Sequence, residues 1–192
     1  MNEVVAVRHG ETEWSREGRH TGLTDVPLAA TGEAQAVAVG SALQGRVFAL
    51  VLCSPLQRAL HTASLAGFAR PVVDPDLVEW DYGGYEGLTT TAIRAGLGRD
   101  WTIFADGVPP GATPGETAAE VGTRADRIVS RVREVDGDVL VFSHGHFLRV
   151  LAARWVGEEP GFGARLALAT ATISRLGSEH DLPVVQEWNR TA

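Results

Sequence analysis

Two histidines and two arginines stand at points of this sequence where they could bind and attack a phosphoryl group. Arg8 and His9 directly follow the apolar run EVVAV, His144 directly follows DVLVFS, and Arg58 comes shortly after FALVLC. Guanidinium groups grip phosphate oxygens with paired hydrogen bonds, and a neutral imidazole is a nucleophile. Because neighbouring guanidinium groups disfavour an imidazolium ion, we expect His9 to be neutral and able to attack phosphorus.

Transfer of a phosphoryl group from an alcohol also needs an acid that protonates the departing oxygen. We select Glu79, in the stretch LVEWDYGGYEG, because it begins a turn-rich segment and lies among Trp80 and Tyr82. Asp81 and Glu86 are alternatives of the same residue type. The residues alone do not decide between these three carboxyl groups.

Three strands buried on both faces must bring these side chains together. The apolar runs 3–7, 48–53 and 138–143 predict the strands, and the segments between them contain helical patterns. This alternation is typical of an α/β fold with a mainly parallel sheet. Ligands of such sheets bind outside the carboxyl ends of the strands, beside helix N-termini, so we expect the polar clusters to meet there.

Helices are predicted over four ranges: 31–45, 54–67, 116–135 and 145–157. Thr31 is expected to cap the first helix. Ser54 is expected to cap the second, with Pro55 at its first position. Three weaker strands complete the sheet, one of them as an antiparallel edge: 69–74, 171–177 and 183–188.

The segment 80–117 is rich in Gly, Pro, Thr and aromatic residues, and we expect it to be an insertion or lid over the site, within a single domain of residues 1–192. Gly10 and Gly145 are expected to leave room for an oxyanion beside the two histidines. Gly145 is therefore predicted to bind substrate.

The composition of the chain excludes several classes of partner and of chemistry. The net charge is −7 with no basic run, so we expect neither nucleic acid nor a membrane as partner. All 17 basic residues are arginine, which excludes lysine Schiff-base chemistry and the lysine-containing phosphate-binding loop. Cys53, the one cysteine, is expected to be a reduced core thiol. With no secretion-type N-terminus and no long apolar run, a cytoplasmic location is expected.

Four linked motifs, VRHGETEW, SPLQRALHTA, LVEWDYGGYEG and SHGHF, resemble the histidine phosphatase superfamily, also called the phosphoglycerate mutase-like family. The likeness extends from about Val4 to Val156. It implies a three-layer α/β/α sandwich around a mainly parallel sheet. It also implies chemistry without a metal or other cofactor.

The resemblance assigns a role to each matching residue. His9 corresponds to the phosphorylated nucleophile. Glu79 corresponds to the proton donor, and later to the base that activates water, which favours it over its two alternatives. The phosphate pocket of the family corresponds to Arg8, Arg58 and His144.

Other pocket positions separate phosphatases from mutases within the family. Ser15 stands where mutases usually carry Asn, whereas Thr21, Gly22 and Tyr82 match mutase substrate-pocket positions. The lysine that mutases carry shortly after the tyrosine cannot exist here. The paired arginines of the mutases are not evident in residues 101–114. The segment between Glu79 and His144 is also shorter than the corresponding segment of the mutases. The sequence looks most like the branch of sedoheptulose-1,7-bisphosphatase and broad-specificity acid phosphatases, which implies small phosphorylated substrates such as sugar phosphates or bisphosphates.

Several alternatives stay open at this point. The chain could be a cofactor-dependent phosphoglycerate mutase, or a phospholigand-binding module without catalysis. His144 and His146 have the spacing of a metal-ligand pair, and Cys53 followed by Arg58 is similar to a cysteine phosphatase loop with one residue too few. A homodimer is compatible with all of these.

The remaining histidines and tryptophans carry little signal. Three histidines are expected at the surface: His20, His61 and His180. Three tryptophans are expected in the core, namely Trp14, Trp101 and Trp155. Trp101 together with Phe104 is also a candidate for the entrance of the site.

Overall fold

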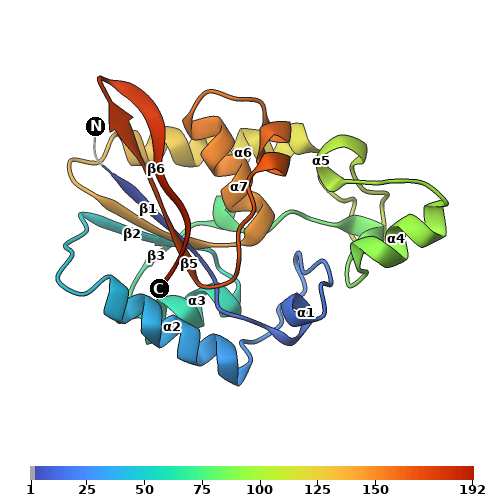
Figure 1. Ribbon diagram of the computed structural model, residues 1–192, viewed down its shortest axis with the longest axis horizontal. Coiled ribbons are helices and arrows are strands. Elements are labelled where there is room, and N and C mark those ends of the chain that lie inside the picture. Colours follow the sequence, from blue (N-terminus) through green and yellow to red (C-terminus); the bar gives the residue numbers. More distant parts are fainter. Residues whose placement is uncertain (1–2) are drawn as a thin grey trace.

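A six-stranded sheet with the order β3-β2-β4-β1-β5-β6 forms the centre of the molecule. The structure, a computed structural model that describes residues 3–192, is drawn in Figure 1. The first four strands of that order run parallel, and β5 and β6 continue the sheet as an antiparallel hairpin. The strands are β1 (Val4–Arg8), β2 (Leu50–Cys53), β3 (Val72–Val73), β4 (Val139–Ser143), β5 (Thr172–Glu179) and β6 (Leu182–Thr191).

Helices cover both faces of the sheet, which makes the fold a three-layer α/β/α sandwich (Figure 1). On one face, α2 (Ala30–Ala42) and α3 (Gln57–Leu65) pack on side chains such as Val5, Val7 and Phe142. On the other, α6 (Ala118–Arg133) and α7 (Gly145–Trp155) pack on a larger core. Because successive strand residues face opposite sides, β1 and β4 are apolar on both faces up to their last residues, Arg8 and Ser143.

The register of the strands brings the polar clusters to one edge. Arg8 of β1 pairs with Ser143 of β4, and Cys53 of β2 pairs with Phe142 of β4. The strands therefore end level with one another. The residues that follow them, His9 among them, emerge together at the carboxyl edge, which confirms the predicted convergence.

Two predicted helix caps are wrong. Helix α2 begins at Ala30, so Thr31 lies inside it and its hydroxyl donates to the Glu11 carboxylate instead. Helix α3 begins at Gln57, later than predicted. Leu56 rather than Ser54 is its N-cap, and the hydroxyl of Ser54 binds both the amide of Leu56 and the His144 ring.

The segment 80–117 contains two helices that the turn-rich pattern concealed, α4 (Thr90–Leu97) and α5 (Ile103–Asp106). They form a lobe beyond the carboxyl edge of the sheet, opposite α1 (Glu13–Arg16) (Figure 1). Short 3-10 turns complete the chain: η1 (Pro75–Leu77), η2 (Gly83–Tyr85) and η3 (Pro160–Arg165). Within residues 3–192, no helix has both the length and the apolar character needed to cross a membrane.

Candidate active site

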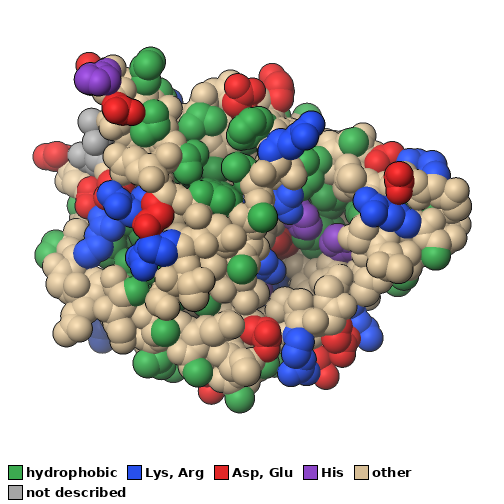
Figure 2. Space-filling model, viewed as in Figure 1, with side chains coloured by type: hydrophobic (Ala, Val, Ile, Leu, Met, Phe, Trp, Pro, Cys, Tyr) green, Lys and Arg blue, Asp and Glu red, His purple; other side chains and the backbone are tan. Residues whose placement is uncertain are grey.

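A cavity of about 180 Å³ opens at the carboxyl edge of the sheet. Figure 2 shows this hollow with arginine and histidine side chains on its walls. Thirteen residues line it: Arg8, His9, Ser15, Gly18, Arg19, His20, Thr21, Glu79, Tyr82, Gly145, His146, Arg149 and Leu168. Arginine supplies its cationic side chains, and Glu79 is the one acid among the thirteen.

His9 presents its Nε2 atom as a free nucleophile. Its Nδ1 lies 2.7 Å from the carbonyl oxygen of Gly10. Because a carbonyl can only accept, Nδ1 carries the proton and Nε2 keeps its lone pair. Burial, with the positive charges of Arg58 and Arg8, holds the pKa of His9 well below its usual value. The structure thus confirms the neutral imidazole that the sequence predicted.

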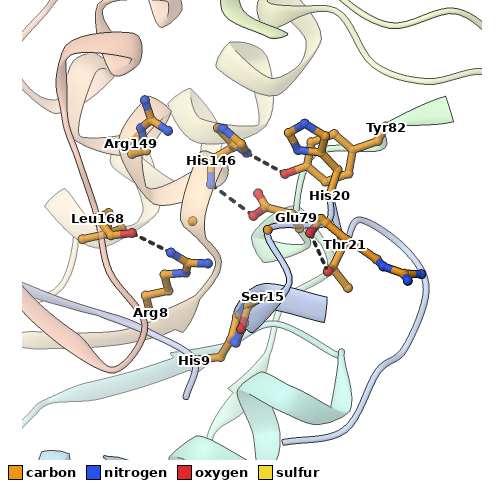
Figure 3. Close-up of a pocket in the computed structure, with 13 residues that line it drawn as sticks. Arg8, His9, Ser15, His20, Thr21, Glu79, Tyr82, His146, Arg149 and Leu168 are labelled. Atoms are coloured by element: carbon orange, nitrogen blue, oxygen red, sulfur yellow. Dashed lines mark hydrogen bonds between the residues drawn. The ribbon is translucent and has the colours of Figure 1, made fainter. Parts of the chain in front are cut away.

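Arg8 reaches into the cavity beside His9 with an unsatisfied donor. One terminal nitrogen donates to the carbonyl oxygen of Leu168 at 2.5 Å, but its buried Nε has no hydrogen-bond partner. Among the buried side-chain nitrogen and oxygen atoms of residues 3–192, Nε of Arg8 is the one without a hydrogen-bond partner. In Figure 3 the guanidinium of Arg8 and the carboxylate of Glu79 point into the same space. A buried guanidinium with a spare donor is suited to binding an oxyanion.

Gly145 makes room for this arginine. A Cβ atom on residue 145 would lie 3.1 Å from Cζ of Arg8, so a side chain here would press on the guanidinium. Gly10 has a different reason from the one predicted. A Cβ there would lie 2.3 Å from the carbonyl oxygen of Gly32 in α2, so helix packing, rather than access for an oxyanion, requires the glycine.

Glu79 is held at the N-terminus of α7. Its carboxylate accepts hydrogen bonds from the backbone amides of His146 at 3.1 Å, Phe147 at 2.9 Å and Trp80 at 3.0 Å. The side chain is only 5 % exposed, yet it lines the cavity. These three donors fix the carboxyl group in one place opposite Arg8.

Carboxylates of the chain itself accept from amides at the N-termini of both helices that follow the site strands. At α7 the amides of His146 and Phe147 donate to Glu79. At α3 the first amide, of Gln57, donates to the carboxylate of Asp25. Each helix dipole is thus satisfied by a carboxylate of the chain itself. Arginine side chains are left to supply the positive charge of the cavity.

Arg58 and His144 lie directly behind His9 and do not line the cavity. The His9 and His144 rings are 5.2 Å apart, and both Arg58 and His144 are fully buried. Arg58 donates from Nε to Nδ1 of His144 at 3.1 Å, so His144 is protonated on Nε2 and donates to the hydroxyl of Ser54. Burial, Arg58 and His9 hold the pKa of His144 well below its usual value.

Arg58 also fixes the loop that forms one wall of the cavity. Its terminal nitrogens donate to the backbone carbonyls of Thr21, Gly22 and Thr24 at 2.8–3.1 Å. Thr21 lines the cavity, whereas Gly22 lies behind it, where a Cβ would meet the carbonyl oxygen of Trp80 at 2.6 Å. Of the two predicted pocket positions, the structure therefore brings only Thr21 to the wall.

Ser15 and Tyr82 both line the cavity, as the sequence predicted. The hydroxyl of Ser15 is engaged in the capping of α1, where it exchanges hydrogen bonds with the backbone of Thr12. The hydroxyl of Tyr82 lies 2.6 Å from Nδ1 of His146 (Figure 3). Burial raises the pKa of Tyr82 well above its usual value, so this hydroxyl keeps its proton.

Two of the wall residues that sequence reasoning missed are His20 and Arg149. His20 was assigned to the surface, but it packs on Tyr82 and Trp101, with ring centroids 4.8 and 5.6 Å away, and burial lowers its pKa to about 4. Arg149 stacks over Phe104 at 4.7 Å and lines the cavity together with His146. His146 and Arg149 are three residues apart on α7 and share a face, which is the signal that could have revealed Arg149.

A second cavity of about 150 Å³ adjoins the first. The two share His20, His146 and Arg149 as walls, and the far side of the second includes Trp101 and Phe104. Trp101 is a core residue at 2 % exposure, as predicted, and still contributes to this wall. His61 and His180 are exposed, also as predicted.

The competing carboxyl groups have structural partners. Asp81 accepts hydrogen bonds from the amides of Gly83 and Gly115, and so joins two loops. Glu86 accepts from the amides of Gly22 and Thr24. Neither lines the cavity, which leaves Glu79 in the position of the acid.

Cys53 has no part in the site. It is fully buried among the core residues between the sheet and the helices α2 and α3, and burial raises the pKa of its thiol to about 12. A nucleophilic cysteine needs a lowered thiol pKa and an exposed position. The cysteine phosphatase alternative therefore fails.

Taken together, the cavity can bind a tetrahedral oxyanion, attack it and protonate what leaves. Arg8 offers a free donor, Nε2 of His9 offers a lone pair, and Glu79 offers a carboxyl group in the same space (Figure 3). Nucleophile, cation and acid are the three parts that phosphoryl transfer to an imidazole requires.

Comparison with known proteins agrees with this geometry. The family model of the histidine phosphatase superfamily, branch 1, matches residues 4–191. An acid phosphatase of Mycobacterium tuberculosis is 44 % identical over 93 % of this chain and 88 % of its own length. Sedoheptulose 1,7-bisphosphatase of Saccharomyces cerevisiae is 37 % identical over 80 % of this chain and 67 % of its own. The solved structure of a functionally characterised open reading frame product of M. tuberculosis superposes with a TM-score of 0.93, at 42 % identity, over 99 % of this chain and 98 % of that one.

Proposed function

This chain belongs to branch 1 of the histidine phosphatase superfamily, and on that premise we propose that His9 is its nucleophile and Glu79 its proton donor. The chain is a phosphoric monoester hydrolase that acts through a phosphohistidine intermediate. One observation above all supports His9 as the residue that is phosphorylated. Its Nε2 is unprotonated, and His9 lines the same cavity as Arg8, whose Nε has no hydrogen-bond partner.

In the first step, the lone pair of His9 Nε2 forms a bond to phosphorus while the bond from phosphorus to the ester oxygen breaks. Glu79, as the carboxylic acid, gives its proton to the departing oxygen, so an alcohol leaves rather than an alkoxide. Arg8 stabilises the phosphoryl oxygens through direct hydrogen bonds. Arg58 contributes its positive charge from behind His9 and holds His144 in place.

In the second step, water attacks the phosphorus of phosphohistidine. Glu79, now a carboxylate, takes one proton from the water, and the bond between Nε2 and phosphorus breaks. Inorganic phosphate leaves and His9 is again neutral. The hydrogen bond from Nδ1 to the carbonyl of Gly10 keeps the ring in one tautomer and one orientation throughout.

We propose that the substrates are small phosphorylated metabolites, with sugar phosphates and bisphosphates foremost. The cavity of about 180 Å³ suits a small molecule. Besides Arg8, it contains Arg149 and Arg19, whose charges would attract a second anionic group, although the chain as a whole carries −7. The yeast relative is named for a bisphosphate substrate, which agrees with this class.

The mutase alternative is not favoured. A mutase must return the phosphoryl group to a reoriented product before water reaches it, and the lysine found in the mutase pocket has no counterpart in this chain. The structure places no further arginine pair beside Tyr82 from residues 101–114. The cavity, as lined here, serves hydrolysis.

Hydrolysis of p-nitrophenyl phosphate in the presence of EDTA tests the proposal. We expect activity in the wild type that is lost in His9→Ala, with inorganic phosphate and p-nitrophenol formed in equal amounts. Full activity of His9→Ala would refute the assignment of the nucleophile. A panel of phosphorylated metabolites that includes sugar bisphosphates would then test the substrate class.

A further inference from the structure

One buried arginine outside the cavity holds the backbone on which the proton donor stands. Arg124 is on α6, and its side chain is only 11 % exposed. Its guanidinium makes a two-pronged contact with the carboxylate of Glu116, at 2.7 and 2.8 Å. The remaining donors point at the chain that leads into Glu79.

Those donors reach carbonyls on both sides of Val78. Nη1 of Arg124 donates to the carbonyl oxygens of Asp76 at 2.6 Å and Val78 at 3.1 Å, and Nη2 lies 3.5 Å from that of Glu79. A planar guanidinium that binds several groups at once fixes their relative positions, which a flexible lysine would not do. The main chain before Glu79 is thereby set in one conformation.

Glu116 completes the contact on the far side of Glu79. Its carboxylate accepts from the amide of Asp81 at 2.9 Å, and its carbonyl accepts from the indole of Trp80 at 2.8 Å. Residues on both sides of Glu79 are therefore tied to one partly buried ion pair. The carboxyl group itself is bound by other donors, the amides at the start of α7.

Arg124 also contacts those donors. Its Cζ lies 5.1 Å from the ring of Phe147, whose amide donates to Glu79. The same guanidinium thus touches the segment that carries the acid and the helix that orients it. It does not line the cavity, and it contacts neither His9 nor Arg8.

We propose that Arg124, paired with Glu116, is a positioning residue that keeps the carboxyl group of Glu79 aligned with the departing ester oxygen. The inference rests on the proposed role of Glu79. It predicts that loss of Arg124 impairs proton donation selectively, because binding of phosphate and attack by His9 use other residues.

The test compares two substrates in three variants and one control variant. p-Nitrophenyl phosphate has a leaving group that departs without help, whereas glycerol 2-phosphate has an alkoxide that needs the proton. We expect Arg124→Gln to lower kcat/KM for glycerol 2-phosphate by about tenfold more than for p-nitrophenyl phosphate, since small displacements of a catalytic group cost such factors. Inhibition by inorganic phosphate should change by less than about twofold, because Arg8 is untouched.

Arg127→Gln is the matched control. Arg127 is on the same helix and binds the side chain of Asp76, at 2.5 and 2.7 Å, but it is 54 % exposed and touches no carbonyl near Glu79. We expect the ratio of kcat/KM between the two substrates to be the same in Arg127→Gln as in the wild type. Should Arg124→Gln fail to fold, Glu116→Gln removes the charge that anchors Arg124 and is expected to give the same selective loss in smaller degree.

Glu79→Gln separates failure of this inference from failure of the proposed function. If Glu79→Gln itself lowers kcat/KM equally for both substrates, the acid role of Glu79 is wrong. A different result is that Glu79→Gln lowers kcat/KM more for glycerol 2-phosphate, while Arg124→Gln and Glu116→Gln lower kcat/KM equally for both substrates or leave both values unchanged. That result overturns the positioning role, and the proposed function stands. Selective loss in all three variants, with the Arg127→Gln ratio unchanged, supports the inference.

Discussion

Lowering the pH from 7 to 5 tests whether the fold holds His9 neutral. In the unfolded chain the imidazole has a pKa near 6.5. In the folded chain, burial and the charges of Arg58 and Arg8 place that pKa well below this value. Below about pH 6.5 the unfolded chain therefore binds a proton that the folded chain does not, and the free energy of unfolding must decrease as the pH falls.

The magnitude follows from the unfolded-state pKa near 6.5 and from a folded-state imidazole that stays neutral down to pH 5. A buried imidazole that stays neutral lowers the free energy of unfolding by about 1.4 kcal/mol for each unit by which the pH falls, well below pH 6.5. His9 is 3 % exposed, so solvent screens this effect little. Summed from pH 7 to pH 5, the contribution of His9 is about 2 kcal/mol, a large part of the 5–15 kcal/mol typical of a folded domain. His144 is fully buried and adds a similar amount.

Urea unfolding at pH 7 and pH 5, in a buffer without phosphate, measures this contribution by difference. We expect wild type to lose about 2 kcal/mol more than His9→Asn between the two pH values, because the variant lacks the titrating group. His61→Asn, which changes an exposed imidazole, should behave as wild type. Equal losses for wild type and His9→Asn would refute the argument that the fold excludes the proton from His9.

Three further predictions concern catalysis and binding. Glu79→Gln should lower kcat/KM for an alkyl phosphate by about 10²-fold or more and that for an aryl phosphate much less, measured by phosphate release; equal losses would contradict the acid role. Arg149→Gln should raise KM for sugar bisphosphates by about tenfold while leaving p-nitrophenyl phosphate nearly unchanged, since it removes one charge–charge hydrogen bond; Arg154→Gln, which breaks an ion pair with Asp126 outside the cavity, is its control. Gly145→Ala places a methyl group 3.1 Å from Cζ of Arg8 and should weaken inhibition by inorganic phosphate; unchanged inhibition would show that Arg8 does not need this space.

The central sheet and the place of the site at its edge could be predicted, because the apolar strand pattern in the sequence is strong. The buried strands β1, β2 and β4 are apolar on both faces, and residues that follow parallel strands must meet at one edge. The positions of Arg8 and His9 follow from that rule alone. The α/β sandwich was likewise expected and is confirmed, whereas one antiparallel edge strand was expected and the structure has two, β5 and β6.

Local choices between competing partners could not be predicted. The amides at the start of α7 were free to bind an anion of any source, and the sequence does not say that Glu79 takes them. The hydroxyl of Ser54 was expected to cap a helix, but it binds the His144 ring as well as the amide of Leu56, and the helix begins after both residues. Both outcomes depend on long-range geometry that spacing along the chain does not contain.

The walls of the cavity were also beyond prediction. His20 is in a loop without periodicity, and its burial depends on the packing of the α4–α5 lobe, which supplies Trp101. Helix α4 itself was hidden in a turn-rich segment, although Thr89 at its N-cap and Gly98 in a left-handed conformation at its end mark its limits. Such caps are informative only once a helix is already suspected.

Trapping the phosphoenzyme tests the central claim most directly. Enzyme mixed with excess p-nitrophenyl phosphate, quenched in alkali during turnover and digested, should contain a phosphoryl group on the peptide that holds His9, stable to alkali and lost in acid. His9→Ala should give no phosphopeptide and no turnover. A phosphoryl group on a serine, or undiminished turnover by His9→Ala without any phosphoenzyme, would contradict the account.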